Sequence, residues 1–132
     1  MLKGLGRTTL LVHDYEEALA FYRDVLGFTV LHDSTASSGQ RFLHIGLPDQ
    51  RGSPPVGLWL LEPAGDDAEL VGRQAGGQPL LVIYTDDCHG DVATLQRRGV
   101  GFRGPPVAEG GALFAHFSDL YGNVVVLVEL LM

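Results

Sequence analysis

The sequence predicts an α+β fold in which two βαβββ modules form a cupped, eight-stranded mixed sheet with helices on its outer face. A strand, a capped helix and three further strands follow one another twice along the chain. Corresponding residues of the two copies are 72 positions apart, as in the pairs Asp14 and Asp86, Gly27 and Gly99, and His44 and His116. A repeat at constant spacing indicates that both halves share one architecture.

The fourth strand of each half supports the repeat, with Leu-Trp-Leu-Leu-Glu at 58–62 and Val-Val-Leu-Val-Glu at 125–129. These strands are 67 positions apart because a loop in the first half is longer, by about five residues. The chain of 132 residues has room for one core, and each half alone has too little apolar surface. We expect a single domain over 1–132 with halves at 4–71 and 79–131, joined by the Gly- and Gln-containing stretch 72–78.

In the first half, the helix has the strongest local signals. Asp14 is a favourable N-cap, Glu17 lies at the third helical position, and Gly27 is expected to end the helix. Apolar residues recur between these ends at helical spacing. β-branched and aliphatic runs predict strands at 8–12, 28–32, 41–47 and 56–61, the last two separated by a loop with Gly52, Pro54 and Pro55.

The second half repeats this order of elements. Asp86 or Asp87 is expected to cap a helix that runs to Arg98 and is closed by Gly99. The same strand signals predict four strands in this half, at 80–85, 100–103, 113–117 and 124–130.

Composition and charge argue against several classes of protein. A net charge of −7 without a basic stripe argues against a nucleic-acid partner, and it either favours cationic ligands or only improves solubility. No apolar run approaches the roughly 20 residues of a membrane span, and the first residues lack a signal peptide's apolar stretch. Cys88 is the one cysteine, which fits a reducing compartment. We therefore expect a cytoplasmic protein without a membrane partner.

Four segments carry a resemblance to a known family: His13–Ala18, Phe21–Phe28, Leu95–Val100 and Phe117–Asn123. Together they resemble the vicinal oxygen chelate superfamily, which includes glyoxalase I, extradiol dioxygenases and bleomycin-resistance proteins. The last segment departs from the usual Asp-Pro-Asp-Gly-Asn at Leu120 and Tyr121. The resemblance covers nearly the whole chain and implies the two-module fold, but a fold does not by itself define a function.

Metal-using members of this superfamily bind a divalent ion through side chains of the first and fourth strands of each half. The resemblance places these ligand positions at Arg7, Trp59, Leu80 (or Pro79) and Val126. None of these side chains is a usual metal ligand. Glu62 and Glu129 lie three positions further along their strands and therefore face the other side. We expect neither a metal in the usual place nor another cofactor.

Strand alternation predicts which side chains face the inside of the cup. Leu43, Ile45 and Leu47 form an aliphatic face suited to pack under a helix, and Leu113, Ala115 and Phe117 do so in the second half. The opposite faces are mostly apolar with a few polar groups, as small-molecule sites commonly are. The predicted ligand-binding residues are Arg7, Thr9, Phe42, His44, Trp59, Leu61, Phe114, His116 and Val126.

Several of these residues, and Cys88, have more than one interpretation. His44 and His116 are the candidate catalytic acid/base pair, or ligands of a relocated metal, or hydrogen-bonded residues without a chemical role. Arg7 could clamp an anionic group of the ligand or point to solvent. Trp59 could stack on a flat ligand or fill volume. Cys88, in the first turn of the second helix, could be a nucleophile if the helix dipole lowers its pKa.

The sequence favours a protein that binds a small, partly aromatic or apolar organic molecule without metal, with antibiotic sequestration as the activity that the resemblance implies. We expect a homodimer. The alternatives are a glyoxalase- or dioxygenase-type metalloenzyme and a metal-free enzyme that uses His44 or His116 as acid or base. The sequence identifies neither the ligand nor any turnover.

Overall fold

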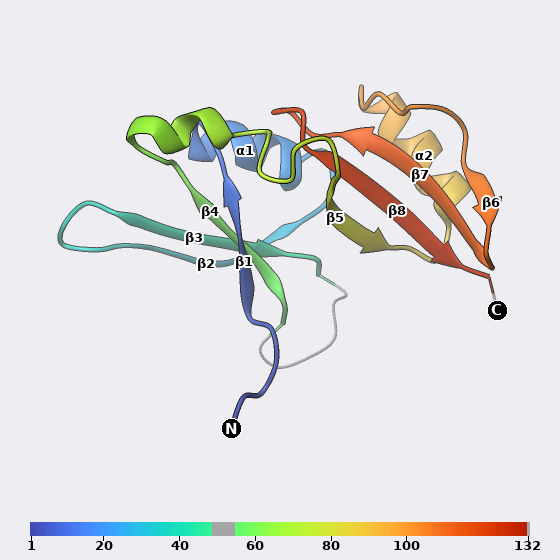
Figure 1. The fold of residues 1–132 in the computed structure, drawn as a ribbon. Helices are drawn as coiled ribbons and strands as arrows, with labels where there is room; N and C mark the ends of the chain where they lie inside the picture. Colours follow the sequence, from blue (N-terminus) through green and yellow to red (C-terminus); the bar gives the residue numbers. More distant parts are fainter. Residues whose placement is uncertain (49–54, 132) are drawn as a thin grey trace. The chain divides into compact units, whose positions relative to one another are not determined.

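A computed structural model describes residues 1–48 and 55–131, and in it the chain divides into two units, Met1–Val71 and Gly72–Met132 (Figure 1). The loop residues Gly52 and Pro54 lie outside the described residues. The elements of the first unit are β1 (Arg7–Leu11), α1 (Tyr15–Tyr22), β2 (Thr29–Thr35), β3 (Arg41–Gly46), β4 (Gly57–Leu61) and the 3-10 helix η1 (Gly65–Leu70). Those of the second unit are β5 (Pro79–Tyr84), α2 (Cys88–Arg97), β6 (Val107–Glu109), β7 (Ala112–Ser118) and β8 (Val124–Leu130).

The two units have the same sheet topology. The first sheet has the order β1-β4-β3-β2 and the second has the order β5-β8-β7-β6. In each, the first strand pairs in parallel with the fourth, and the remaining pairs are antiparallel. The predicted α+β fold of two βαβββ modules is confirmed, and its eight strands form two mixed sheets of four. The single domain over 1–132 stays a prediction.

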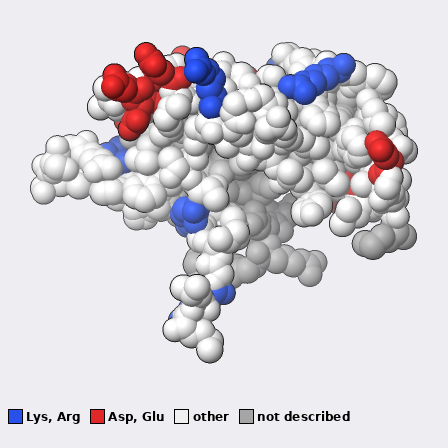
Figure 2. Space-filling view, viewed as in Figure 1, with Lys and Arg blue, Asp and Glu red and all other residues white. Residues whose placement is uncertain are grey.

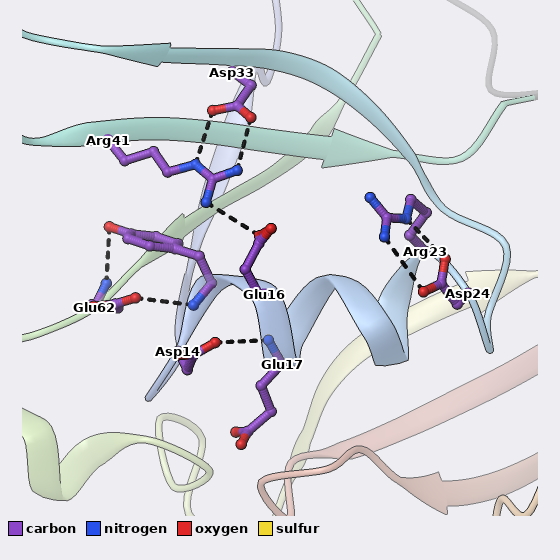
Figure 3. Close-up of polar contacts among 9 residues, drawn as sticks. Asp14, Glu16, Glu17, Arg23, Asp24, Asp33, Arg41 and Glu62 are labelled. Carbon is purple, nitrogen blue, oxygen red and sulfur yellow. Dashed lines mark hydrogen bonds and ion pairs between the residues drawn. The ribbon is translucent and has the colours of Figure 1, made fainter.

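Both helices begin where the sequence indicates. Asp14 Oδ1 accepts a hydrogen bond of 2.8 Å from the backbone N–H of Glu17 (Figure 3), and Asp87 Oδ1 accepts one of 2.9 Å from Gly90. These bonds satisfy amides that have no partner within a helix. Helix α1 ends at Tyr22, earlier than predicted, and turns continue to Gly27, which has a φ of 92°.

The fourth strand of each sheet is tied to the start of its module's helix. Glu62 Oε2, just after β4, accepts a hydrogen bond of 2.9 Å from the Tyr15 amide (Figure 3). Glu129 Oε1, on β8, accepts one of 2.8 Å from the Cys88 amide. The two glutamates therefore have equivalent structural roles, as the repeat would require.

The predicted strand at 100–103 is wrong. Val100 is buried and its amide bonds to the Leu95 carbonyl at 3.0 Å, so this amide closes the helix instead of joining the sheet. Phe102 forms only an isolated bridge with Phe117. Prolines have no N–H to donate to a neighbouring strand, so Pro105 and Pro106 do not extend the sheet, and regular pairing begins at β6.

The helix η1 was not predicted from the sequence. Acidic side chains gather over it in Figure 2.

Burial alternates along the strands that border the core of each unit. In β3, Leu43 and Ile45 are fully buried, whereas the intervening Phe42 and His44 are half-buried. In β7, Ala115 and Phe117 are buried, whereas Phe114 and His116 are half-buried. We call the less buried side of each sheet its open face. The open face of the first sheet carries Arg7, Thr9, His32, Phe42, His44, Trp59 and Leu61.

Candidate functional site

A row of four side chains crosses the open face of the first sheet. Directly paired residues of neighbouring strands project to the same side of a sheet. Thr9 of β1 pairs with Trp59 of β4, Trp59 pairs with His44 of β3, and His44 pairs with His32 of β2. The register therefore brings two histidines and the one tryptophan of the chain side by side.

The three rings of this row and the ring of Phe42 lie close to one another on the open face. The centroid of Trp59 lies 5.4 Å from that of His44 and 6.1 Å from that of Phe42, and the rings are tilted by 55° and 46°. His32 lies 5.4 Å from His44. Since Trp59, His44 and Phe42 are all half-buried, part of this surface is open to a flat molecule.

Arg7 reaches from β1 across β4 to His44. Its Nε donates a hydrogen bond of 3.2 Å to His44 Nδ1, and its Nη1 donates to the carbonyls of Gly6 at 2.9 Å and Pro55 at 2.6 Å. The residue opposite Arg7 on β4 is Gly57, which has no side chain to block this path. Arg7 is therefore anchored within the first sheet instead of extending into solvent.

The contact with Arg7 determines the protonation state of His44. An arginine Nε is always a donor, so His44 Nδ1 must accept, and the neutral imidazole carries its hydrogen on Nε2. Burial lowers the pKa of His44, and the positive charges of Arg7 and His32 lower it further. His44 is thus a neutral hydrogen-bond donor, which fits recognition better than it fits the role of a base.

Two polar atoms of the row are buried without a hydrogen-bond partner among the residues that the structure describes. They are Nε2 of His44 and Nε1 of Trp59. Both atoms carry a hydrogen. The contact with Arg7 places the hydrogen of His44 on Nε2, and an indole nitrogen is always a donor. Buried donors are nearly always paired in folded proteins, so two of them on neighbouring rings are an unusual feature.

The open face of the second sheet is more apolar. His116 pairs with Val126, which pairs with Val82, and Phe114 pairs with Val128, which pairs with Tyr84. The rings of Phe114 and His116 are 6.1 Å apart. Val82 and Tyr84 are 57% and 69% exposed, and this large apolar exposure was not anticipated from the sequence.

His44 and His116, the predicted acid/base pair, belong to different units.

His32 lies on the open face of the first sheet but is absent from the ligand-binding residues predicted from the sequence. A β-bulge between Val30 and His32 shifts the register, and the shift places His32 opposite His44. Strict alternation along the strand would place the ring elsewhere, so the sequence offers no signal for this neighbour.

The residues at the implied metal-ligand positions do not fit a metal ion. Arg7 uses its N–H groups on an imidazole and two carbonyls, and neither the Trp59 indole nor the Val126 side chain offers a lone pair to a cation. Glu62 and Glu129 are engaged at the helix starts. Within residues 1–48 and 55–131, no group of three His, Cys, Asp or Glu side chains is placed to hold a metal.

Cys88 does not have the properties expected of a nucleophile. Its side chain is fully buried, and burial raises its pKa, with further contributions from the negative charges of Glu129, Asp91 and Asp87. The expectation that the helix dipole lowers the pKa of this thiol is wrong, because desolvation disfavours the thiolate more strongly.

Comparisons with known proteins agree with the fold. A family model described as Glyoxalase/Bleomycin resistance protein/Dioxygenase superfamily matches residues 4–127. An uncharacterised protein from Shewanella frigidimarina is 33% identical over 132 residues, covering 98% of this chain and 96% of its own.

Two solved structures are also similar. TnmS3, an antibiotic binding protein from Streptomyces sp. CB03234, has a TM-score of 0.78 and 29% identity over 98% of this chain and 97% of its own. UcmS2 has a TM-score of 0.81 and 27% identity over 97% of this chain and 98% of its own. None of the described helices is long and apolar enough to cross a membrane.

Proposed function

Because the chain belongs to the glyoxalase/bleomycin resistance protein/dioxygenase superfamily, we propose that it binds a small, partly aromatic or apolar organic molecule without a metal ion. The observation that carries this proposal is the position of Trp59 between the rings of Phe42 and His44 on a half-buried face. Such a surface offers stacking area together with a few polar groups, as binding sites for small organic molecules do.

We propose ligand-binding residues on the open face of each sheet, each considered by itself. Those of the first sheet include most of the polar and aromatic side chains, and those of the second sheet are more apolar. The residues are Arg7, Thr9, Phe42, His44, Trp59 and Leu61 from the first sheet, and Phe114, His116 and Val126 from the second.

Sequestration is the form of binding that we favour, and an antibiotic is the class of ligand. Support comes from the likeness to TnmS3, which is described as an antibiotic binding protein. The donor state of His44 adds to it, since a side chain whose Nδ1 lone pair is already engaged is poorly suited to remove a proton from a substrate. We further propose that the protein acts as a homodimer in the cytoplasm.

Fluorescence titration tests the proposal directly, because Trp59 is the one tryptophan in the chain. We expect at least one member of a panel of aromatic antibiotics to quench its emission saturably. The variant Trp59→Phe, followed by calorimetry, should bind that compound more weakly. The ligand should be recovered chemically unchanged after incubation. No saturable response to any compound would contradict ligand binding, and a converted compound would contradict sequestration.

A further inference from the structure

The unpaired donors of His44 and Trp59 specify more about the ligand than its shape. Both atoms are shielded from solvent, and neither has a partner among the described residues. The rings that carry them are half-buried side chains of the open face, so each donor is covered while another part of its residue is exposed. An acceptor that enters beside Trp59 would therefore meet N–H groups that are already desolvated.

Arg7 prevents His44 from changing its role. If Nε2 were to become an acceptor, the hydrogen would have to move to Nδ1, where it would face the Nε–H of Arg7 at 3.2 Å. Two donors would then oppose each other, and arginine cannot release its hydrogen. Nε2 is consequently held as a donor, and Arg7 acts as a positioning residue for it.

The charge of this face, like its N–H donors, favours a ligand with hydrogen-bond acceptors over a cationic ligand. Among the residues of β1 to β4, Asp33 is the one carboxylate, and it is bound by Arg41 at 2.8 Å. Asp33 pairs with Leu43, which is fully buried and therefore on the other side of the sheet from His44. The open face thus carries the Arg7 cation without an acidic side chain from these strands, despite the net charge of −7 of the whole chain.

From these observations we infer that the ligand is a flat aromatic molecule with an oxygen acceptor on its ring, such as a carbonyl, which receives hydrogen bonds from His44 Nε2 and Trp59 Nε1. A cationic drug is not the ligand of this face, in contrast to what the acidic composition alone suggests. This inference rests on the proposed function and specifies the chemistry that its site recognises.

A matched pair of probes tests the inference: fluorenone carboxylate and fluorene carboxylate, with the acid at the same ring position. The two molecules share their rings and charge and differ only in the ring carbonyl. An acceptor that satisfies a buried donor improves affinity by about tenfold per hydrogen bond. We expect the ketone to bind the full-length protein at least about tenfold more tightly than the hydrocarbon.

The tryptophan also allows the proposed hydrogen bond to be observed by NMR spectroscopy, which an affinity measurement does not do. With one tryptophan in the sequence, a nitrogen-15 spectrum contains a single indole N–H resonance. We expect the ketone to move this resonance downfield, as a new hydrogen bond does, and the hydrocarbon to leave it much less shifted. The variants Trp59→Phe and His44→Leu should each reduce the affinity ratio, whereas His44→Gln, which keeps an N–H donor, should retain more of it.

Phe42→Leu is the matched control, because it removes an aromatic contact without removing a donor. It should weaken both probes alike and leave their ratio unchanged. Equal affinity of the wild-type protein for the two probes would overturn the inference and leave the proposed function standing. Failure of both probes to bind would contradict the proposed function itself.

Discussion

Arg7 Nε lies 3.2 Å from His44 Nδ1, so the first strand of the first sheet is joined to the third strand across the strand between them. This hydrogen bond links Arg7, at a position where the resemblance implied a metal ligand, to a histidine of the open face. Its consequence is a neutral imidazole with its hydrogen directed away from Arg7.

Replacing Arg7 by Met should raise the pKa of His44. The substitution removes a positive charge that lowers this pKa, while the burial that contributes most remains, so the pKa should stay below the ordinary value. An NMR titration of the imidazole measures the change. Arg7→Lys serves as the comparison because it keeps a charge without the Nε geometry, and an unchanged pKa in Arg7→Met would contradict the proposed coupling.

The stability of the protein should decrease on acidification because of His44. Its pKa is lowered on folding, so the unfolded chain binds more protons than the folded one at pH values between the folded pKa and the ordinary 6.5. The free energy of unfolding therefore falls as pH decreases through 6.5 towards the folded pKa, and this contribution is fully present only above 6.5.

Urea denaturation at a series of pH values measures this dependence. The variant His44→Gln cannot titrate, so its free energy of unfolding should depend less on pH than that of the wild type over this interval. Parallel curves for the two proteins would show that His44 is not the group responsible.

Gly57→Ala should destabilise the first unit by roughly 1–3 kcal/mol, as overpacking of a close contact does. A Cβ at this position would lie 2.5 Å from the Ile45 carbonyl oxygen and 3.4 Å from Cδ of Arg7. Thermal or chemical denaturation gives the loss. Gly101→Ala is the control, since a Cβ there meets nothing within 4 Å and its stability should be close to that of the wild type.

Asp119→Ala should cost about 3 kcal/mol of folding free energy. Asp119 is buried, its Oδ1 accepts hydrogen bonds of 2.9 Å from the amides of Tyr121 and Asn123, and its Oδ2 accepts one of 2.9 Å from the Asn123 side chain. Removing the carboxylate leaves these donors unsatisfied. Asp24→Ala, which removes an exposed pair with Arg23, should change stability little, and an equal loss in both variants would refute this explanation.

Features encoded by neighbouring residues could be predicted from the sequence. The cap at Asp14 and the alternation along β3 depend on contacts over a few positions, and the repeat supplied the module order. Features that depend on pairing between distant strands could not be predicted. The bond from Arg7 to His44 requires a register across three strands, and the place of His32 requires a bulge that no local signal marks.

The missed strand β6 has a similar explanation. Residues 100–103 have the composition of a strand, but Val100 is needed to close the helix and two prolines follow shortly after. The competition between helix closure and sheet pairing is decided by the packing of the unit, which composition does not report.

The most direct test of the central claim is the affinity of a quenching compound before and after exhaustive treatment with a metal chelator. If recognition depends on Trp59, His44 and Phe42, the dissociation constant should be unchanged by the treatment, and added Zn²⁺, Mn²⁺, Ni²⁺ or Fe²⁺ should not alter it. Loss of binding on chelation, with recovery on addition of one of these ions, would contradict the account.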